Sequence, residues 1–554
     1  MNIKNKTFQL FTYLLFAITT LYSFSISQLY YLTSKGPDYD FYKPYFDYFF
    51  GSINETGVEQ GLIYYFLHAF IATFNSEYLN DFHLDQHMSN SIQIGNFVFY
   101  IMGLIGIYKF LKNRKYNKET IFFVLSLINI FPPAIEMRLL FKPEILIFCC
   151  LIWIIVFLDS YIDCHDFRYL LYAIPPLVFI ATIKANLAMM VGIFLTFFYL
   201  NKIYKVDKNY FYYSVVLFAV LFSLLTFENF SANSLFIFQH QSPEEFSGRA
   251  GFDYLYNIDF KSIWSNPFRE SQKNSFIGIL LLDTFDDYFG NFWTDDSSPL
   301  YLNRIIYFSI KETAFIGIFF TFMLYVFLFI QIRKNKNNRL IYLMPFIGIV
   351  TQMIISQFSL HNPETGDLAK TYYYSFFLVI VFSLLAAELS KINFKILIIT
   401  SLVFAVLILH VYGFPKENDS DQEKYLNYNN QINILCEINN KLLSTVNTDC
   451  IPRDELLCYQ TYESVNKTTI RNSKYINITV EPIKKLTLFK DNTAYKVINF
   501  DDCLEKIKEN YYPAKVYTIK NIPIFNILNF MFFIIFIFRY SFEKKKTDRP
   551  SYIY

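Results

Sequence analysis

The sequence predicts an all-α protein that crosses a membrane many times. Of its 554 residues, 54% are hydrophobic and only 17% are charged, whereas soluble domains carry nearer a quarter of charged residues. The apolar residues also fall in runs of roughly 17 to 25, the length of helix that crosses a hydrocarbon core about 30 Å thick. The net charge of +2 and the lack of any nucleic-acid-binding motif argue against a nucleic-acid partner.

The apolar runs predict about twelve membrane-spanning helices. No A-x-A-like cleavage site follows the first run, which is long; a retained helix is therefore favoured over the alternative, a cleaved signal peptide. The predicted spans lie near residues 8–29, 92–111, 120–134, 145–161, 169–183, 186–200, 210–228, 305–331, 340–358, 372–389, 396–412 and 523–540.

Basic residues in the connectors predict the orientation. They gather at 4–6, 109–118, 202–208, 333–339, 391–395 and 544–549. With twelve spans these segments all lie on one side, as the positive-inside rule requires of cytoplasmic loops, so both termini are predicted to be cytoplasmic. The predicted exported connectors are 30–91, 135–144, Lys184, 229–304, 359–371 and 413–522.

Composition divides the chain into three predicted parts. Residues 1–412 form a transmembrane domain with large exported loops at 30–91 and 229–304, and residues 523–554 form the last span and a basic cytoplasmic tail. Residues 413–522 are rich in polar residues and contain the β-like runs YINITV and AKVYTI, which indicates a small exported α+β domain.

Cysteines offer an independent argument about that domain. An exported segment with four cysteines favours two disulfides, and three pairings are possible. The alternative is four free thiols in a cytosolic domain, which would require an odd number of spans. The four are Cys436, Cys450, Cys458 and Cys503, whereas Cys149 and Cys150 fall in a span and Cys164 on the cytoplasmic side.

Three aspartates follow the first span, in the stretch TSKGPDYDFYKPYFDYFFGS. A carboxylate that is partly desolvated next to the membrane can accept a proton from a hydroxyl, because desolvation raises its basicity. The alternative is that Asp38, Asp40 and Asp47 only solvate a loop whose tyrosines anchor it at the membrane interface. Those tyrosines are Tyr39, Tyr42, Tyr45 and Tyr48.

Charged residues also interrupt the stretch FPPAIEMRLLFKPEILIF, where two prolines are expected to end a span. Arg138 and Lys142 are four residues apart and would share a face if helical. Charges at that depth pair with one another or face a polar cavity. Pairing of Glu136 with Arg138, or of Lys142 with Glu144, is one interpretation. The other is a cationic site for a phosphate.

Two further exported connectors carry cations. Lys184 lies between two apolar runs with no acidic residue near it in the sequence, so it is expected either to reach lipid headgroups or to contact a substrate phosphate. The stretch HNPETGDLAKTYYY adds Lys370 and His361. Because short connectors can converge, these cations are expected to share one face of the membrane with Asp38.

Other patterns carry less information. Residues 61–74 are apolar enough to lie along the membrane, and 229–304 alternates aromatic with polar residues as interfacial segments do. The stretch HLDQH has a zinc-like spacing of two imidazoles but no third ligand pattern, so surface histidines are favoured at His83 and His87, with Asp85 between them. A cation site or a solvated turn is possible at Asp283, Asp286 and Asp287.

Residues 8–412 resemble the GT-C superfamily of integral-membrane glycosyltransferases, which includes protein O-mannosyltransferases and the aminoarabinose transferase of lipid A. Four features carry the resemblance: GPDYDFY with the following VEQGLIYYFL, MRLLFKPEILIF, FIATIKANL, and GDLAKTYYYSFFLVI. The paired acidic motif of the mannosyltransferases is Asp-Tyr-Asp here, so the choice between Asp38 and Asp40 as catalytic base stays open, as does the acceptor class.

The resemblance implies an inverting transfer of a sugar from a polyprenyl-phosphate donor to a hydroxyl of a lipid, glycan or protein. Asp38 would be the base, with Asp40 as the alternative. Donor phosphate ligands would be Arg138, Lys142, Lys184 and Lys370, and Glu59, Glu136 and His361 are further candidate contacts. No metal ligand is predicted, although a divalent cation remains possible. The implied location is a bacterial inner membrane, in contact with membrane lipids, with the active face periplasmic.

Two rival functions remain at this stage. A polysaccharide polymerase or ligase would use similar chemistry to join preassembled chains. A transporter or flippase of lipid-linked sugars is the other alternative, but transporters often contain internal repeats and midplane charges, whereas the notable charges here are predicted at one face. That difference favours an enzyme.

Overall fold

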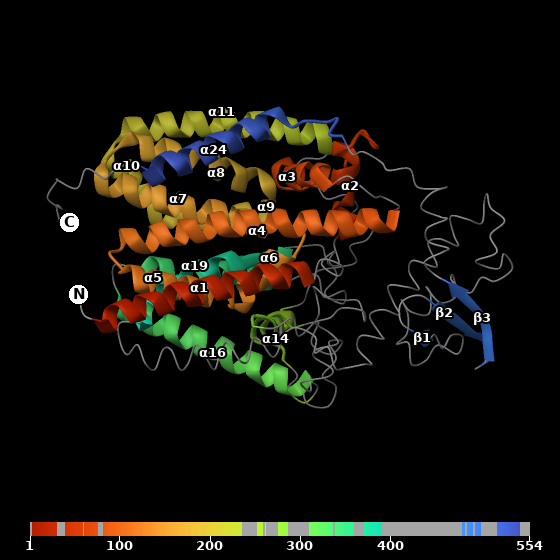
Figure 1. Cartoon of the computed structure of the whole chain (residues 1–554). Helices are drawn as coiled ribbons and strands as arrows, with labels where there is room; N and C mark the ends of the chain where they lie inside the picture. The colour runs from red at the N-terminus through yellow and green to blue at the C-terminus, as the bar shows by residue number, and fades with distance from the viewer. Residues whose placement is uncertain are drawn as a thin grey trace.

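The computed structural model describes residues 3–29, 39–58, 60–75, 81–234, 252–258, 261, 275–285, 310–335, 338–358, 371–390, 479–481, 485–490, 493–499 and 518–542. Most of the described residues form helices that run side by side in one bundle (Figure 1). Helix α1 (Ile3–Leu29) begins, and helix α24 (Ile524–Phe542) ends, at one end of this bundle, which we call the terminal end. Helices α2 (Tyr39–Phe49) and α3 (Leu62–Ala72) lie at the opposite end, which we call the α3 end.

The remaining elements follow in chain order. They are η1 (Thr73–Asn75), α4 (Asp81–Asn113), α5 (Lys118–Asn129), α6 (Pro132–Leu139), α7 (Glu144–Cys164), α8 (Phe167–Ile183), α9 (Ala185–Leu195), the π-helix η2 (Thr196–Leu200), α10 (Asn201–Val206), α11 (Lys208–Asn233), α12 (Asp253–Tyr256), α14 (Phe276–Asp283), α16 (Ile310–Lys334), α17 (Arg339–Tyr342), α18 (Met344–Phe358), η6 (Thr371–Tyr374), α19 (Ser375–Leu389), β1 (Thr479–Glu481), β2 (Lys485–Lys490) and β3 (Thr493–Asn499).

Within the described residues, 7 helical segments are long and apolar enough to cross a membrane, or 8 if the bent pair α5 and α6 forms one span. This identifies a helical, multi-pass membrane protein. All the predicted spans overlap helices except 396–412, which lies outside the described residues. The segments are Ser91–Asn113, Glu144–Cys164, Ala185–Val206, Lys208–Asn233, Gly317–Lys334, Arg339–Gln357 and Ile524–Phe542.

Part of the connector predicted at 135–144 is helical: residues up to Leu139 belong to α6 and Glu144 begins α7, so only 140–143 lie between the two helices. Pro132 and Pro133 begin α6 instead of merely ending the preceding span. The first positions of a helix suit proline, because their N–H groups have no partner within the helix. The new helix is bent by 60° from α5, and all eight of its residues are buried. The prolines therefore redirect the chain into the protein.

The start of α3 is held against the turn between α8 and α9. Gly61 donates its N–H to the Ile183 carbonyl at 3.0 Å. A Cβ at Gly61 would lie only 2.8 Å from the Thr182 carbonyl oxygen, so a larger residue would force the two segments apart. Lys184, directly after Ile183, is extended between the two helices.

Helix α24 returns to the first half of the chain and packs on α8, α11 and α3. Its first N–H groups, those of Phe525 and Asn526, donate to the Glu228 carboxylate of α11 at 3.0 and 2.8 Å. A carboxylate at that position satisfies N–H groups that the helix itself leaves unbonded and complements the helix dipole. Just before the helix, the Lys520 N–H donates to the Phe49 carbonyl at 2.8 Å, which ties α24 to α2.

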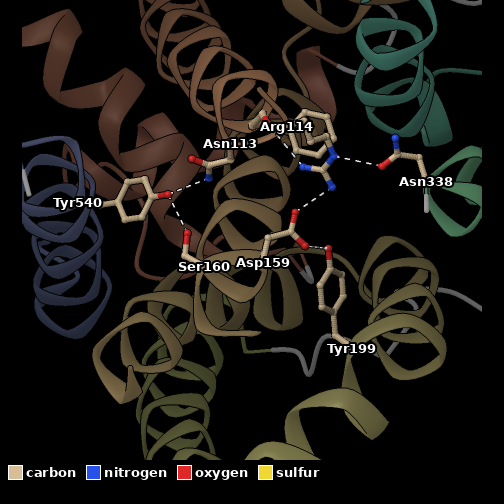
Figure 2. Close-up of polar contacts among 8 residues, drawn as sticks. Asn113, Arg114, Asp159, Ser160, Tyr199, Asn338 and Tyr540 are labelled. Atoms are coloured by element: carbon tan, nitrogen blue, oxygen red, sulfur yellow. Dashed lines mark hydrogen bonds and ion pairs between the residues drawn. The ribbon is translucent and has the colours of Figure 1, made fainter. Parts of the chain in front are cut away.

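A polar cluster joins the helices at the terminal end (Figure 2). The Arg114 guanidinium lies 2.9 Å from the Asp159 carboxylate and donates to the Asn338 side chain at 3.3 Å. Nearby, the Tyr540 hydroxyl of α24 accepts from the Asn113 amide at 2.9 Å. We call this set the terminal cluster; it comprises Asn113, Arg114, Asp159, Ser160, Tyr199, Asn338 and Tyr540.

The described part of 413–522 includes an antiparallel sheet of order β1-β2-β3. Strand β1 overlaps the end of the β-like run YINITV. The four cysteines of this region lie outside the described residues, so the predicted disulfides remain predictions. In the bundle, Cys149 and Cys150 are buried in α7, and Cys164 is exposed at its end.

Candidate functional site

The structure describes only part of the predicted site. Asp38, Glu59, His361 and Lys370 lie outside the described residues. Asp40 lies in the first turn of α2, but its side chain also lies outside the description. The side chains of the other candidates are described, and they are Glu136, Arg138, Lys142 and Lys184.

The tyrosines after the acidic motif are buried inside the protein. Tyr42 and Tyr45 are 3% and 0% exposed, which contradicts the interpretation that they anchor a loop at the membrane interface. The Tyr45 ring stacks on Tyr65 of α3, with centroids 3.9 Å apart and an angle of 2° between the rings. Helix α2, whose first turn contains Asp40, is therefore packed tightly on α3.

Gln60 ties these tyrosines together. Its side-chain amide donates to the Tyr42 hydroxyl at 2.9 Å and accepts from the Tyr65 hydroxyl at 2.6 Å. Its main-chain carbonyl accepts from the Tyr45 hydroxyl at 2.8 Å. The helix predicted within 61–74 is present, but most of α3 is buried in the protein. It does not simply lie along the membrane surface as the sequence indicated.

The two charged residues of α6 and the lysine that follows it are buried as well. Arg138, Lys142 and Glu136 are 0%, 3% and 4% exposed. Because α6 ends at Leu139, Lys142 lies beyond it, and the condition under which Arg138 and Lys142 would share a helical face is not met. The Arg138 guanidinium lies 5.3 Å from the centroid of the Tyr100 ring. Among the described residues its polar contact is with the Tyr100 side chain, no hydrogen bond of its three nitrogens has good geometry, and no carboxylate pairs with it.

Lys184 has an acidic neighbour that the sequence did not reveal. Its Nζ lies 3.4 Å from Oε1 of Glu144, at the start of α7, and 4.7 Å from the centroid of the Tyr373 ring in η6. Glu144, which one interpretation of the sequence paired with Lys142, forms an ion pair with Lys184. Tyr373 belongs to the segment that follows Lys370, and Lys370 itself lies outside the described residues.

Phe141 connects the acidic segment to the cationic one. Its ring packs edge-on against Tyr42 and Tyr65, with centroids 6.0 and 5.3 Å away, and is stacked with Phe46 at 5.4 Å. It stands in the sequence between Arg138 and Lys142. Helix α2 therefore packs directly on the segment that carries these cations.

A stripe of polar residues on α4 was missed by the sequence analysis. Gln93, Asn96 and Tyr100 follow one another at intervals of three and four, so they lie on one face of the helix. All three contact the end of α6, through its main-chain carbonyls or the Arg138 guanidinium. Polar residues on one face of an apolar span mark functional positions, and this spacing is the signal that could have revealed them.

The weaker candidates receive little further support. His83, Asp85 and His87 lie on α4, but their side chains are outside the described residues, as are those of Asp283, Asp286 and Asp287. Within the described part of the chain, no group of three or more His, Cys, Asp or Glu is arranged to hold a metal ion.

No protein-family model, curated protein or solved structure matches this chain. Its class therefore follows from the fold and the site alone. It is a helical, multi-pass membrane protein with a buried arginine, a buried lysine and a lysine–glutamate ion pair around the connection of α6 and α7.

Proposed function

We propose that the protein is a membrane glycosyltransferase that moves a sugar from a polyprenyl-phosphate donor to a hydroxyl of a lipid, glycan or protein acceptor. The observation that carries this proposal is Arg138, a fully buried guanidinium that has no carboxylate partner among the described residues. Moving such a charge out of water costs several kcal/mol. Its contact with the Tyr100 ring offsets about 1 to 2 kcal/mol of this cost.

An anionic ligand would supply the missing compensation. Guanidinium groups bind phosphates through paired, charge-assisted hydrogen bonds, and a charged residue inside a membrane protein marks a functional site by default. A phosphate attached to a lipid suits this position, because its lipid tail keeps it within the membrane and its negative charge is attracted to a buried cation. Lys142 and the ion-paired Lys184 border the same α6–α7 connection and would share the phosphate charge.

The proposed reaction is a direct displacement. The Asp38 carboxylate takes the proton of the acceptor hydroxyl while the hydroxyl oxygen forms a bond to the anomeric carbon. The bond from that carbon to the phosphate oxygen breaks on the opposite side, so the configuration inverts and polyprenyl phosphate leaves. Negative charge grows on the departing phosphate, and Arg138, Lys142, Lys184 and Lys370 would stabilise it there.

The packing of α2 supports this assignment of roles. The helix that starts within the acidic motif is fixed to α3 through Tyr45 and Gln60, and to the cationic segment through Phe141. A base and a leaving-group site must keep a constant separation if the acceptor is to attack in line. The contacts around α2 provide such a rigid link.

The test is a transfer assay on membranes that contain the protein, supplied with a panel of radiolabelled polyprenyl-phosphate sugars and with native lipid and glycan acceptors. Asp38→Asn should lower transfer by about a thousandfold or more, because the base is lost, while membrane insertion is unchanged. Asp40→Asn tests the alternative base, and Asp47→Asn in the same segment is the matched control, expected within about threefold of wild type.

Two outcomes would count against the proposal. Full activity of Asp38→Asn together with a large loss in Asp40→Asn would transfer the role of base to Asp40. Full activity of both variants, or no transfer from any donor by correctly inserted wild-type protein, would reject the glycosyltransferase function itself.

A further inference from the structure

The main chain at the end of α6 is bonded from outside the helix. The last carbonyls of a helix lack N–H partners within it, and burial makes that lack costly. Helix α4 supplies the donors: the Asn96 side-chain amide donates to the carbonyls of Arg138 and Leu140 at 2.9 and 2.7 Å. Gln93 donates to the Leu139 carbonyl at 2.8 Å. Three successive carbonyls are thus held by two side chains of one helix face.

The orientation of the Asn96 amide is fixed on its other side too. Its Oδ1 accepts from the Tyr64 hydroxyl at 2.8 Å and lies 3.1 Å from Nε2 of His68. Both side-chain N–H groups and the carbonyl oxygen are therefore engaged, and Asn96 is fully buried. The close approach of His68 also requires glycine at position 95, where a Cβ would lie 2.7 Å from the imidazole.

The bonding of the main chain matters because few contacts hold the Arg138 side chain. Among the described residues its guanidinium has no carboxylate partner and no hydrogen bond of good geometry, and its polar neighbour is Tyr100 of the same α4 stripe. The direction of the side chain consequently depends on where its main chain is fixed. Asn96 is the residue that fixes it, on both sides of Leu139.

We infer that Asn96 is a positioning residue that sets the direction in which Arg138 presents its charge to the donor phosphate. This inference rests on the proposed function, since it assigns a role within the same donor site. Asn96 does not touch the phosphate; it acts through the main chain of Arg138 and Leu140.

The experiment measures binding of undecaprenyl phosphate to purified full-length protein in detergent, with undecaprenol as the lipid that lacks the phosphate. The variants are Asn96→Asp, Arg138→Leu and the double variant. Aspartate keeps the shape of asparagine, but its carboxylate cannot donate to two carbonyls. The matched control is Asn529→Asp in α24, because Asn529 is a buried asparagine whose amide donates to the Pro175 carbonyl at 3.0 Å.

Each single variant of the site should weaken undecaprenyl phosphate binding by about tenfold or more. The double variant should be no more than about twofold weaker than Arg138→Leu alone, because Asn96 acts through Arg138. The binding of undecaprenol by each variant should stay within about twofold of wild type. The control variant Asn529→Asp should bind both lipids within about twofold of wild type. Should Asn96→Asp fail to accumulate in membranes, Asn96→Ser introduces no charge and is judged by the same criteria.

The outcomes distinguish a failure of the positioning role of Asn96 from a failure of the proposed glycosyltransferase function. Wild-type binding by the Asn96 variant, beside a loss in Arg138→Leu, would overturn the positioning role alone. Losses that multiply in the double variant would also overturn it, since they would show an effect independent of Arg138. Wild-type binding of undecaprenyl phosphate by Arg138→Leu would instead show that Arg138 is not part of the donor site. It would thereby contradict the observation on which the proposed function rests.

Discussion

The bundle contains one arginine near each end, and the partners of the two guanidinium groups differ. In the terminal cluster, Arg114 faces a carboxylate, an amide and an aromatic ring: Asp159 at 2.9 Å, Asn338 at 3.3 Å and the Phe110 ring at 3.8 Å. Toward the α3 end, Arg138 has the Tyr100 ring beside its guanidinium, and it is the Arg138 main chain that is bonded.

Burial sharpens the contrast. The Arg114 and Asp159 side chains are 18% and 23% exposed, so water shares in their solvation. Arg138 is fully buried. A partly exposed, fully paired arginine fits a role in joining helices, because its charge is already balanced within the protein. A buried arginine with no carboxylate partner among the described residues fits a role in binding, because its charge is left for another molecule. The comparison predicts that removing the two arginines has opposite effects on stability and on binding.

The largest effect is expected from Arg138→Leu. Binding of undecaprenyl phosphate should fall by about tenfold or more, whereas the midpoint of thermal unfolding in detergent should stay the same or rise, because a buried charge is replaced by an apolar side chain. The measurements are a lipid-binding titration and a thermal unfolding curve on the same preparation. A lower midpoint with unchanged binding would mean that Arg138 is structural, and the contrast between the two ends would disappear.

Arg114→Leu should produce the reverse pattern with a smaller effect. Asp159 would lose its cation and keep the Tyr199 hydroxyl, which donates to it at 2.9 Å, so the protein should lose about 1 kcal/mol of stability. Undecaprenyl phosphate binding and sugar transfer should remain within about twofold of wild type.

The same Arg114 variant distinguishes an enzyme from a transporter. Alternating access opens each end of a transporter in turn, so loosening the terminal cluster would change the transport rate. An enzyme that works at the α3 end has no such requirement. A large change in the turnover of Arg114→Leu, with unchanged affinity for the lipid, would favour the transporter.

The smallest effect is expected at Asp166, which precedes α8 near the terminal end. A side-chain hydrogen bond from Arg168 lowers the pKa of this carboxyl below its ordinary value. Since the folded pKa is the lower one, the stabilisation is present at neutral pH and is lost as the pH falls below about 4. Asp166→Asn keeps an N-cap residue, so its free energy of unfolding should differ from that of wild type by less than about 0.5 kcal/mol at pH 7. A difference that persisted at pH 3 would show that the charge is not responsible.

Sequence reasoning located the helices far better than the surroundings of the charges. Long apolar runs identify spans because a single segment must satisfy the membrane on its own. The partner of Lys184 could not be found this way, since Glu144 comes from another helix and lies 40 residues away in the chain. The prolines at 132 and 133 were interpreted as a stop, although the same residues also suit the start of a helix.

The burial of the cations is the other feature that could not be predicted from the sequence. The stretch around Arg138 has the charge density of an exposed turn, and only the packing of α4 and α6 shows that it lies inside the protein. The α4 stripe was visible in principle, because Gln93, Asn96 and Tyr100 share a helix face in an apolar segment. Its side chains are neutral, so no run of charge marks it in the sequence.

The packing of α24 has a consequence for biosynthesis. This helix is translated after every other described element, yet it lies against α8, α11 and α3, which leave the ribosome much earlier. Until α24 is inserted, the Glu228 carboxylate lacks the N–H groups at the start of this helix. Ser160 and Asn113 likewise lack their hydrogen bonds to the Tyr540 hydroxyl. The surfaces of α8, α11 and α3 that α24 covers therefore stay without this neighbour in the membrane until α24 has been inserted.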